Sequence, residues 1–280
     1  MTIHTARLRA LQVCALVALC LAALATPALA DDGTPPARAV PLARALPRTF
    51  ASYNELIATA QAVAGDQAAL FTRLESARTE ADLAKSILAT YVDPRVRGGL
   101  IRTESVAIER TVAALRAEIA NSAAVATQLV AAGASAYPPA PTWQRPLAGE
   151  VSQPFGPTDV GLEPARVYNG VSYGHFHDGV DIIDPAGTPI VAPARGRVVF
   201  AGRMMDGAEV VVIAHDDGLV SLFAHLEDGP HAPPVKAGDI VQPGDRIGSV
   251  GLTGMTTGYH LHWAVYQNGT PIDPLSTLGG

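Results

Sequence analysis

Histidine recurs in three short stretches of the C-terminal half, in one of them together with aspartate, and both residue types bind metals and transfer protons. The first stretch reads HDGVD and contains His177 and Asp181. The second reads HLH and contains His260 and His262, and the third places His225 at the end of LVSLFAH. Two histidines and one aspartate would supply three ligands to a zinc ion. They would leave the fourth tetrahedral position open for water, as in catalytic zinc sites.

The spacing within the first two stretches limits how they can act. In a straight strand, His177 and Asp181 would lie about 13 Å apart, too far for one metal ion. Gly179 between them permits a bend or bulge that would bring imidazole and carboxylate together. His260 and His262 are two residues apart, so on a strand they point to the same face, roughly 6.6 Å apart. One of them could bind a metal while the other works beside it.

Residues 148–280 have the texture of a β-domain, because glycine and proline separate short runs rich in β-branched residues. The runs Val210 to Ala214 and Leu219 to Ala224 flank HDDG as a predicted hairpin. The sequence QNGT, around Asn268 and Gly269, is a strong signal for a second tight turn. We therefore expect short antiparallel strands.

Residues 51–131 have a helical pattern. Ser52 to Glu55 fits a helix capping box, and Pro94 with two following glycines would end the first helix. Two alanine-rich seams predict an antiparallel, coiled-coil-like helical hairpin. Such a hairpin could serve as a stalk, a docking site for a partner or a regulatory arm, or it could be a spacer that packs only on itself or on the second domain. The first seam, broken by Gln67, is Leu56, Ala60, Val63, Leu70, Leu74, Ala77, Ala81, Ala84, Leu88 and Tyr91. The second, with Ser105 and Ser122 as polar members, is Ile101, Ile108, Val112, Leu115, Ile119, Ala126 and Leu129. The expected fold class is a multidomain α+β protein.

The N-terminal residues 1–30 are expected to be a signal peptide, with a short apolar run and the small-x-small pattern Ala28-Leu29-Ala30. An uncleaved anchor is the alternative. No other stretch is long and apolar enough to span a membrane, so an exported protein, periplasmic or extracellular, is expected. Both cysteines lie in this segment, which leaves no disulfide in the mature chain. Residues 31–50 and the Pro/Ala-rich residues 132–147 read as linkers.

The charge distribution argues against nucleic acid as a partner. The whole chain has a formal net charge of −6. Residues 145–280 carry 7 Lys+Arg against 15 Asp+Glu and show no basic stripe. An acidic half of this kind repels the phosphate backbone.

The C-terminal half also carries the motifs HDGVDI, GTPIVAPARGRVVFAG, LVSLFAHL, VKAGDIVQPGDRIGSVGLTG and TGYHLHWAV, in that order. In order, spacing and glycine positions they resemble the lysostaphin/LytM-type zinc metallo-endopeptidases, which cut peptidoglycan cross-links. The resemblance implies that His177, Asp181 and His262 bind Zn²⁺. It also implies that His225 and His260 are the catalytic histidines. The expected substrate is the peptide part of peptidoglycan.

The sequence departs from that family in three places. Phe223 stands where the family often has tyrosine, and Pro157-Thr158 stand where arginine often follows the early glycine. The segment TDVGLEPARVYNGVSYGHF lengthens the approach to the first ligand, and its Asn169 could reach the metal. These departures leave the substrate preference open.

The remaining histidines are expected outside the chemistry. His175 is expected in a loop or lining the cleft, and His215 and His231 are expected to be solvated turn residues.

Two other functions are compatible with parts of the sequence. One is a non-enzymatic activator or scaffold of another cell-wall hydrolase, which would bind that protein partner through the helical arm. The other is a biotinyl or lipoyl carrier or a phosphotransferase module. Lys236, the only lysine of this half, lacks the flanking residues of a carrier, and a signal peptide contradicts a cytoplasmic module. Which peptidoglycan bond would be cut stays open.

Overall fold

The structure is a computed structural model that describes residues 45–92, 102–140 and 142–279, without the side chains of residues 90–108. The expected signal peptide, residues 31–44 of the first linker and the predicted stop at Pro94 lie outside the described residues. So do four predicted seam side chains: Tyr91, Ile101, Ser105 and Ile108.

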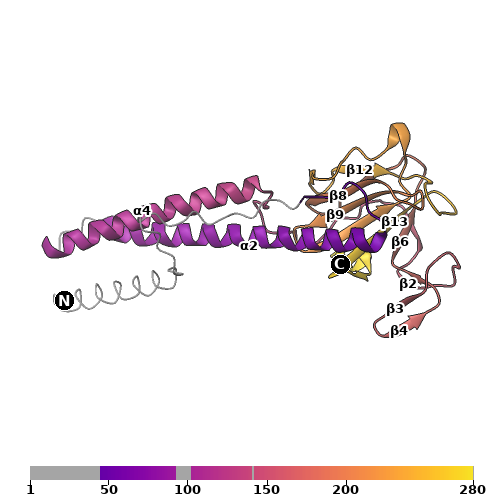
Figure 1. Cartoon of the computed structure of the whole chain (residues 1–280), viewed down its shortest axis with the longest axis horizontal. Coiled ribbons are helices and arrows are strands. Elements are labelled where there is room, and N and C mark those ends of the chain that lie inside the picture. Colours follow the sequence, from indigo (N-terminus) through magenta and orange to yellow (C-terminus); the bar gives the residue numbers. More distant parts are fainter. Residues whose placement is uncertain (1–44, 93–101, 141, 280) are drawn as a thin grey trace. The chain divides into compact units, whose positions relative to one another are not determined.

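Two long helices, α2 (Tyr53–Val92) and α4 (Arg102–Ala131), pack against each other as the predicted hairpin (Figure 1). The predicted capping interaction is present at the start of α2. The Ser52 hydroxyl accepts a hydrogen bond from Glu55 N at 3.2 Å, and the Glu55 carboxylate accepts one from Ala51 N at 2.9 Å. These bonds satisfy backbone donors that a helix start leaves free. None of the described helices has the length and apolar character that crossing a membrane requires.

The first seam divides between two partners. Its C-terminal part packs on α4, where Leu70 and Leu74 form a buried cluster with Val125 and Leu129. Its N-terminal part packs on the β-sheet instead, in a cluster that also contains Val210, Val212 and Ala264 and to which α2 contributes Leu56, Ile57, Ala60, Val63 and Ala64. The seam residues from Leu56 to Ala84 are buried as predicted, and Gln67 between them is buried too, whereas Leu88 is half-buried. The pattern could not distinguish a helix partner from a sheet partner.

The C-terminal part is built on one antiparallel eight-stranded sheet in the order β1-β6-β13-β10-β9-β8-β11, with β14 beside β13. These strands are β1 (Glu150–Gln153), β6 (Gly179–Ile183), β8 (Gly196–Arg203), β9 (Glu209–His215), β10 (Leu219–Ala224), β11 (Ile240–Val241), β13 (His260–Gln267) and β14 (Thr270–Ile272). Both predicted hairpins are confirmed, as β9–β10 and β13–β14. In the second turn, Asn268 and Gly269 have φ values of 51° and 77°, as a two-residue turn of this type requires.

Three small pairs of strands complete the domain. They are β7 (Pro189–Val191) with β12 (Arg246–Ser249), β2 (Gly156–Pro157) with β5 (Phe176–His177), and β3 (Arg166–Tyr168) with β4 (Val171–Tyr173). The β3–β4 hairpin belongs to the segment that lengthens the approach to the first predicted ligand. Aromatic side chains pack along it: the rings of Tyr168, next to the turn, and Tyr173, at the base, lie 4.8 Å and 5.6 Å from the ring of Phe176. A short 3₁₀ helix, η1 (Gly229–His231), follows β10, and η2 (Pro274–Thr277) follows β14.

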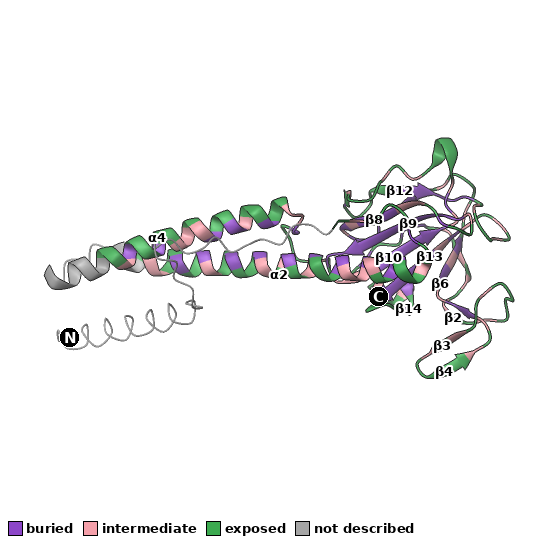
Figure 2. Ribbon diagram, in the orientation of Figure 1, coloured by how far each residue is buried: buried purple, intermediate pink, exposed green. Residues whose placement is uncertain are grey.

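Both faces of the main sheet are buried, as Figure 2 shows for its central strands. Side chains of a strand alternate between faces. Val210 and Val212 therefore face the α2 cluster, while Val211 and Ile213 face the second core with Trp143 and the loops around it. This double burial explains the continuous apolar run of β9. The N-terminal part of α2 is consequently part of the β-domain's core.

We expect Leu56→Ala to destabilise the β-domain by about 2–5 kcal/mol, because it removes a fully buried side chain between α2 and the sheet. Leu83→Ala is the matched control on the same helix, since Leu83 is 47% exposed, and it should change stability by at most about 0.5 kcal/mol. Urea unfolding of the two variants measures the difference. Equal effects would contradict the packing of α2 on the sheet.

Candidate metal centre

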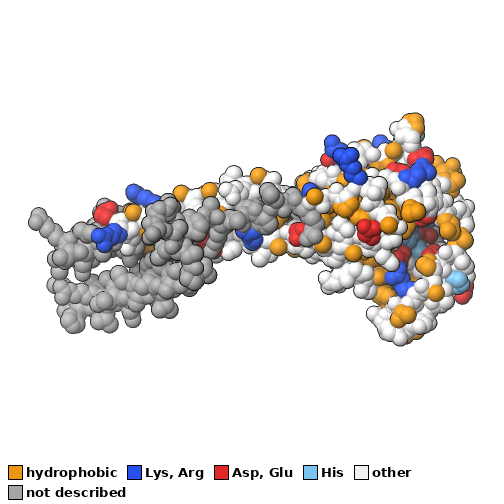
Figure 3. Space-filling model, in the orientation of Figure 1, with side chains coloured by type: hydrophobic (Ala, Val, Ile, Leu, Met, Phe, Trp, Pro, Cys, Tyr) orange, Lys and Arg blue, Asp and Glu red, His pale blue; other side chains and the backbone are white. Residues whose placement is uncertain are grey.

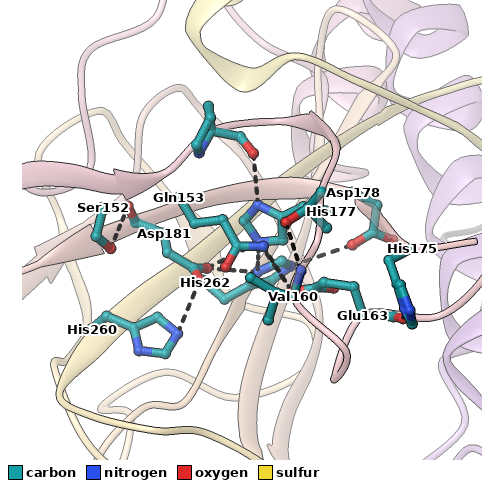
Figure 4. A network of polar contacts seen from close by, with 12 residues as sticks. Ser152, Gln153, Val160, Glu163, His175, His177, Asp178, Asp181, His260 and His262 are labelled. Carbon is teal, nitrogen blue, oxygen red and sulfur yellow. Dashed lines mark hydrogen bonds and ion pairs between the residues drawn. The ribbon is translucent and has the colours of Figure 1, made fainter.

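His177, Asp181 and His262 meet at one point, as predicted (Figure 4). His177 Nε2 lies 3.1 Å from Asp181 Oδ1 and 3.0 Å from His262 Nδ1. The third side of this triangle, from His262 Nδ1 to Asp181 Oδ1, measures 3.0 Å. The three side chains are at most 16% exposed. Each atom carries a lone pair, so the arrangement is a cluster of potential metal ligands.

The strands bring these atoms together in two ways. Asp181 on β6 is the register partner of His262 on β13, so the two residues lie side by side on neighbouring strands. His177 ends β5, a separate short strand, and Asp178 separates it from β6. The chain therefore changes direction between His177 and Asp181, which removes the 13 Å separation of a straight strand.

Gly179 has a different role from the predicted one. A Cβ atom at this position would lie 2.6 Å from Trp263 O and 2.9 Å from His262 Cε1. Glycine is therefore required because β6 passes close to β13 at the site. The bend itself lies at the break between β5 and β6.

The second ring nitrogen of each ligand histidine has its own partner. His177 Nδ1 lies 3.0 Å from Pro154 O, a carbonyl that can only accept, so Nδ1 carries the proton and Nε2 keeps its lone pair. His262 Nε2 faces Asp178 Oδ1 at 3.5 Å, which favours a lone pair on Nδ1. Fixing the tautomer from behind is typical of metal-binding histidines.

The dimensions fit zinc. Bonds of about 2.0–2.1 Å in a tetrahedron place neighbouring ligand atoms roughly 3.3 Å apart. The observed separations of 3.0–3.1 Å are close to this value. Two imidazoles and one carboxylate are also a ligand set that zinc accepts, with one position remaining for water or substrate.

The electrostatics of the cluster favour positive charge at its centre. Burial tends to raise the pKa of Asp181, but the His177 and His262 side chains beside it outweigh burial and lower that pKa. Burial tends to lower the pKa of His262, but Asp178 and Asp181 outweigh it and raise that pKa to about 10. A proton on His262 thus occupies the position of a cation, and metal binding would displace it.

His225 and His260 form a second pair beside the ligands, with ring centroids 4.8 Å apart. His225 Nδ1 lies 2.8 Å from Thr253 O, which places the proton on Nδ1 and the lone pair on Nε2. Burial lowers the pKa of His225 to about 4, with further lowering from the charges of His262 and His260. His225 is therefore neutral near pH 7 and able to accept a proton.

His225 also has an unusual backbone conformation, with φ of 61°. Non-glycine residues rarely adopt this left-handed region, and such strain concentrates at functional sites. His260 lies on β13, where its Nδ1 is 2.9 Å from Gly258 O and its Nε2 is 3.5 Å from Asp181 Oδ2.

The other histidines lie outside this cluster. His175 Nδ1 bonds Glu163 O at 2.7 Å and holds the inserted loop (Figure 4). His231 is exposed, as predicted. The prediction for His215 was wrong: it ends β9, is fully buried, and bonds Ser221 Oγ at 2.6 Å. A strand extended by one residue into HDDG explains the error.

Two acidic residues near the ligands, Glu163 and Asp178, were missed by the sequence prediction. Glu163 Oε1 lies 4.0 Å from His177 Nε2 and accepts a hydrogen bond from Gln153 Nε2 at 3.0 Å. Asn169, the residue expected to approach the metal, is exposed in the β3–β4 turn instead. Asp178 could have been suspected from its place next to a ligand, whereas the loop fold that brings in Glu163 leaves no signal in the sequence.

On the face shown in Figure 3, histidine atoms of the β-domain are visible among acidic side chains, and the Lys and Arg side chains are scattered. This distribution agrees with the acidic balance of residues 145–280.

Comparisons with known proteins agree with this centre. Residues 175–274 match peptidase family M23. The chain is 36% identical over 126 residues to the DD-carboxypeptidase/endopeptidase Mpg of Neisseria meningitidis serogroup B, a match that covers 45% of this chain and 26% of the relative. It is 30% identical over 141 residues to the murein hydrolase activator NlpD of Escherichia coli, covering 50% of this chain and 32% of the relative. The matches thus span only about a quarter to a third of these relatives.

Among solved structures, the catalytic domain of lysostaphin from Staphylococcus simulans is similar, with 30% identity and a TM-score of 0.38. The match covers 46% of this chain and 90% of the lysostaphin domain.

We expect the full chain to bind one zinc ion and His177→Ala to lose that ion, because two of the three ligands would remain. His231→Ala is the matched control, since His231 is exposed in η1 and lies outside the cluster. It should keep one zinc per chain. Metal analysis after equilibrium dialysis measures both, and zinc retained by His177→Ala would contradict the assignment.

Proposed function

Because residues 175–274 form a peptidase family M23 domain, we propose that the protein is an exported zinc-dependent endopeptidase that hydrolyses peptide cross-links of bacterial peptidoglycan. The observation that carries this proposal is the convergence of three lone pairs, from His177, Asp181 and His262, beside the pair His225 and His260. The similarity to an endopeptidase of Neisseria meningitidis supports the reaction class.

Zinc held by these three ligands would supply a Lewis acid that polarises a carbonyl and lowers the pKa of bound water to about 7. The other requirements of peptide hydrolysis fall to the protein's own side chains. A base must accept the proton of the attacking water, and a donor must stabilise the oxyanion and protonate the leaving amine.

His225 is suited to be the base. Its Nδ1 proton is committed to Thr253 O, so Nε2 is the atom that accepts a proton. Its lowered pKa keeps it neutral at physiological pH. Its left-handed backbone holds the ring where β10 ends, beside His260 and His262.

His260 is suited to be the donor. Gly258 O fixes a proton on its Nδ1, and its Nε2 faces the outer oxygen of Asp181. A proton that Nε2 gains during the reaction would face this carboxylate and could then be donated to a developing oxyanion or to the leaving amine. Its side chain is 13% exposed, so little of its surface is open to competing water.

A second candidate function is activation of another cell-wall hydrolase through the helical arm. The similarity to the murein hydrolase activator NlpD favours it. The presence of all three ligands and both further histidines favours the enzyme instead, because an activator needs none of them. Mass spectrometry of fragments from defined peptidoglycan would separate the two and would also identify the bond that is cut.

We expect His225→Ala to lower turnover by about 10²–10⁴-fold while keeping zinc, because the variant loses a proton acceptor but no ligand. His231→Ala, an exposed histidine of η1, is the control and should keep full activity. Release of new amino groups from purified peptidoglycan measures turnover. Wild-type levels of activity in zinc-loaded His225→Ala would exclude this residue as the base.

The acid limb of turnover should lie at or below about pH 4 and not near 6.5, because His225 must be neutral to accept a proton and its pKa is lowered to about 4 even without metal. A nearby zinc ion would lower that pKa further by repulsion. Turnover at saturating substrate, with zinc content checked at each pH, measures this limb. A midpoint near 6.5 with zinc still bound would be inconsistent with His225 as the base.

A further inference from the structure

Asp178 and Arg166 neither bind the metal nor transfer a proton in the chemistry described above, yet they lie directly behind the ligand His262. Asp178 Oδ2 accepts hydrogen bonds from Arg166 Nη2 and from the Tyr266 hydroxyl, both at 2.9 Å. Asp178 Oδ1 faces His262 Nε2 at 3.5 Å, as Figure 4 shows. The Asp178 and Arg166 side chains are only 23% and 30% exposed, so water competes weakly for these contacts.

We propose that Asp178 is a positioning residue for the ligand His262, and that Arg166, by holding Asp178, makes the inserted β3–β4 hairpin a part of the metal site. This inference rests on the proposed function, because it concerns how tightly the same site holds zinc. The inserted segment would then support a metal ligand, independently of any contact it makes with substrate.

The argument starts from the two oxygens of Asp178. Two donors from different strands occupy Oδ2, so the carboxylate cannot rotate without breaking both bonds. Oδ1 is then the oxygen presented to His262 Nε2. Because an ionised carboxylate only accepts hydrogen bonds, it favours a proton on Nε2 and a lone pair on Nδ1, the atom that faces Asp181 and His177.

The two ligand histidines differ in what holds them. His177 is oriented by a backbone carbonyl, Pro154 O, which no side-chain substitution removes. His262 depends on a side chain, Asp178, for the corresponding contact. Partners of this kind change metal affinity by about 10–100-fold in proteins when they are replaced.

Arg166 connects this contact to the inserted hairpin. It lies on β3 and pairs with Tyr173 on β4. The aromatic base of the hairpin fixes its position, because Tyr173 packs against Phe176, the neighbour of the ligand His177. A guanidinium only donates hydrogen bonds, so Arg166 can satisfy a carboxylate at position 178 but repels an amide nitrogen there.

The first test is Asp178→Asn in the full chain. If the oxygen of the asparagine side chain faces His262, the NH₂ group of the same side chain faces the Arg166 guanidinium, and two hydrogen-bond donors then oppose each other. If the amide turns round, it donates to His262 Nε2 and moves the ring proton to Nδ1, where it blocks the metal. We expect zinc affinity to fall about 10–100-fold in competition with a zinc chelator. Asp159→Asn, an exposed carboxylate of the same inserted segment, should bind zinc like the wild type.

The second test is rescue. A glutamine at position 166 can accept a hydrogen bond from the amide at position 178. The double variant D178N/R166Q should therefore bind zinc more tightly than D178N, although R166Q alone should bind it more weakly than the wild type. The unfolding temperature of each metal-free variant is measured beside its zinc affinity. A residue that only stabilises the fold would change the unfolding temperature and the zinc affinity together.

Three results would overturn the inference: D178N with wild-type zinc affinity, a double variant no tighter than D178N, or zinc affinities that only follow the metal-free unfolding temperatures. Because the zinc measurement uses no substrate, failure of this inference can be distinguished from failure of the proposed function. A chain that binds zinc and shows the rescue but cuts no peptidoglycan would contradict the function alone, whereas a wild type without zinc would contradict both.

Discussion

The site depends on one electrostatic constraint: three lone pairs must be held within about 3 Å of one another. His177 Nε2, Asp181 Oδ1 and His262 Nδ1 form this triangle. Such a cluster is unfavourable unless a cation or a proton lies within it, because the electron-rich atoms repel one another at short range. Without metal, Asp178 behind the ring and Asp181 within the triangle raise the pKa of His262, so that a proton takes the place of the cation. Without rigid supports behind each ligand, the side chains would rotate apart.

The sheet supplies that rigidity. Asp181 and His262 are register partners on β6 and β13, strands that lie next to each other within the eight-stranded sheet. A shift of one residue would turn one of the two side chains to the opposite face and destroy the site. Burial of both faces fixes the register, because the apolar side chains of Leu261 and Trp263 alternate with His260 and the ligand His262. The core of the domain and the geometry of the site are therefore set by the same residues.

Patterns in the sequence predicted the elements and singled out the candidate site residues, because both depend on local spacing. The hairpin turn at Asn268 and Gly269 and the pair His260 and His262 are examples. The roles of His177, Asp181 and His262 as ligands were implied only by the resemblance to a known family. What the sequence did not reveal depends on contacts between distant segments. Val63 packs on the sheet and Leu70 on α4, although both belong to one seam. Glu163 reaches the ligands through an irregular loop, and His215 is buried by strand pairing; neither has a periodic signal.

Tyr266 shows how the helical arm and the metal site are physically connected. Its ring is buried in the cluster that α2 forms with the sheet, where Tyr53 of α2 also packs. Its hydroxyl donates to Asp178, which faces the ligand His262. One side chain thus joins the covered face of the sheet to the second nitrogen of a ligand. Packing of α2 restricts the ring, the ring restricts the carboxylate, and the carboxylate restricts the imidazole. The first turns of α2 therefore belong to the support of the metal centre as well as to the hairpin.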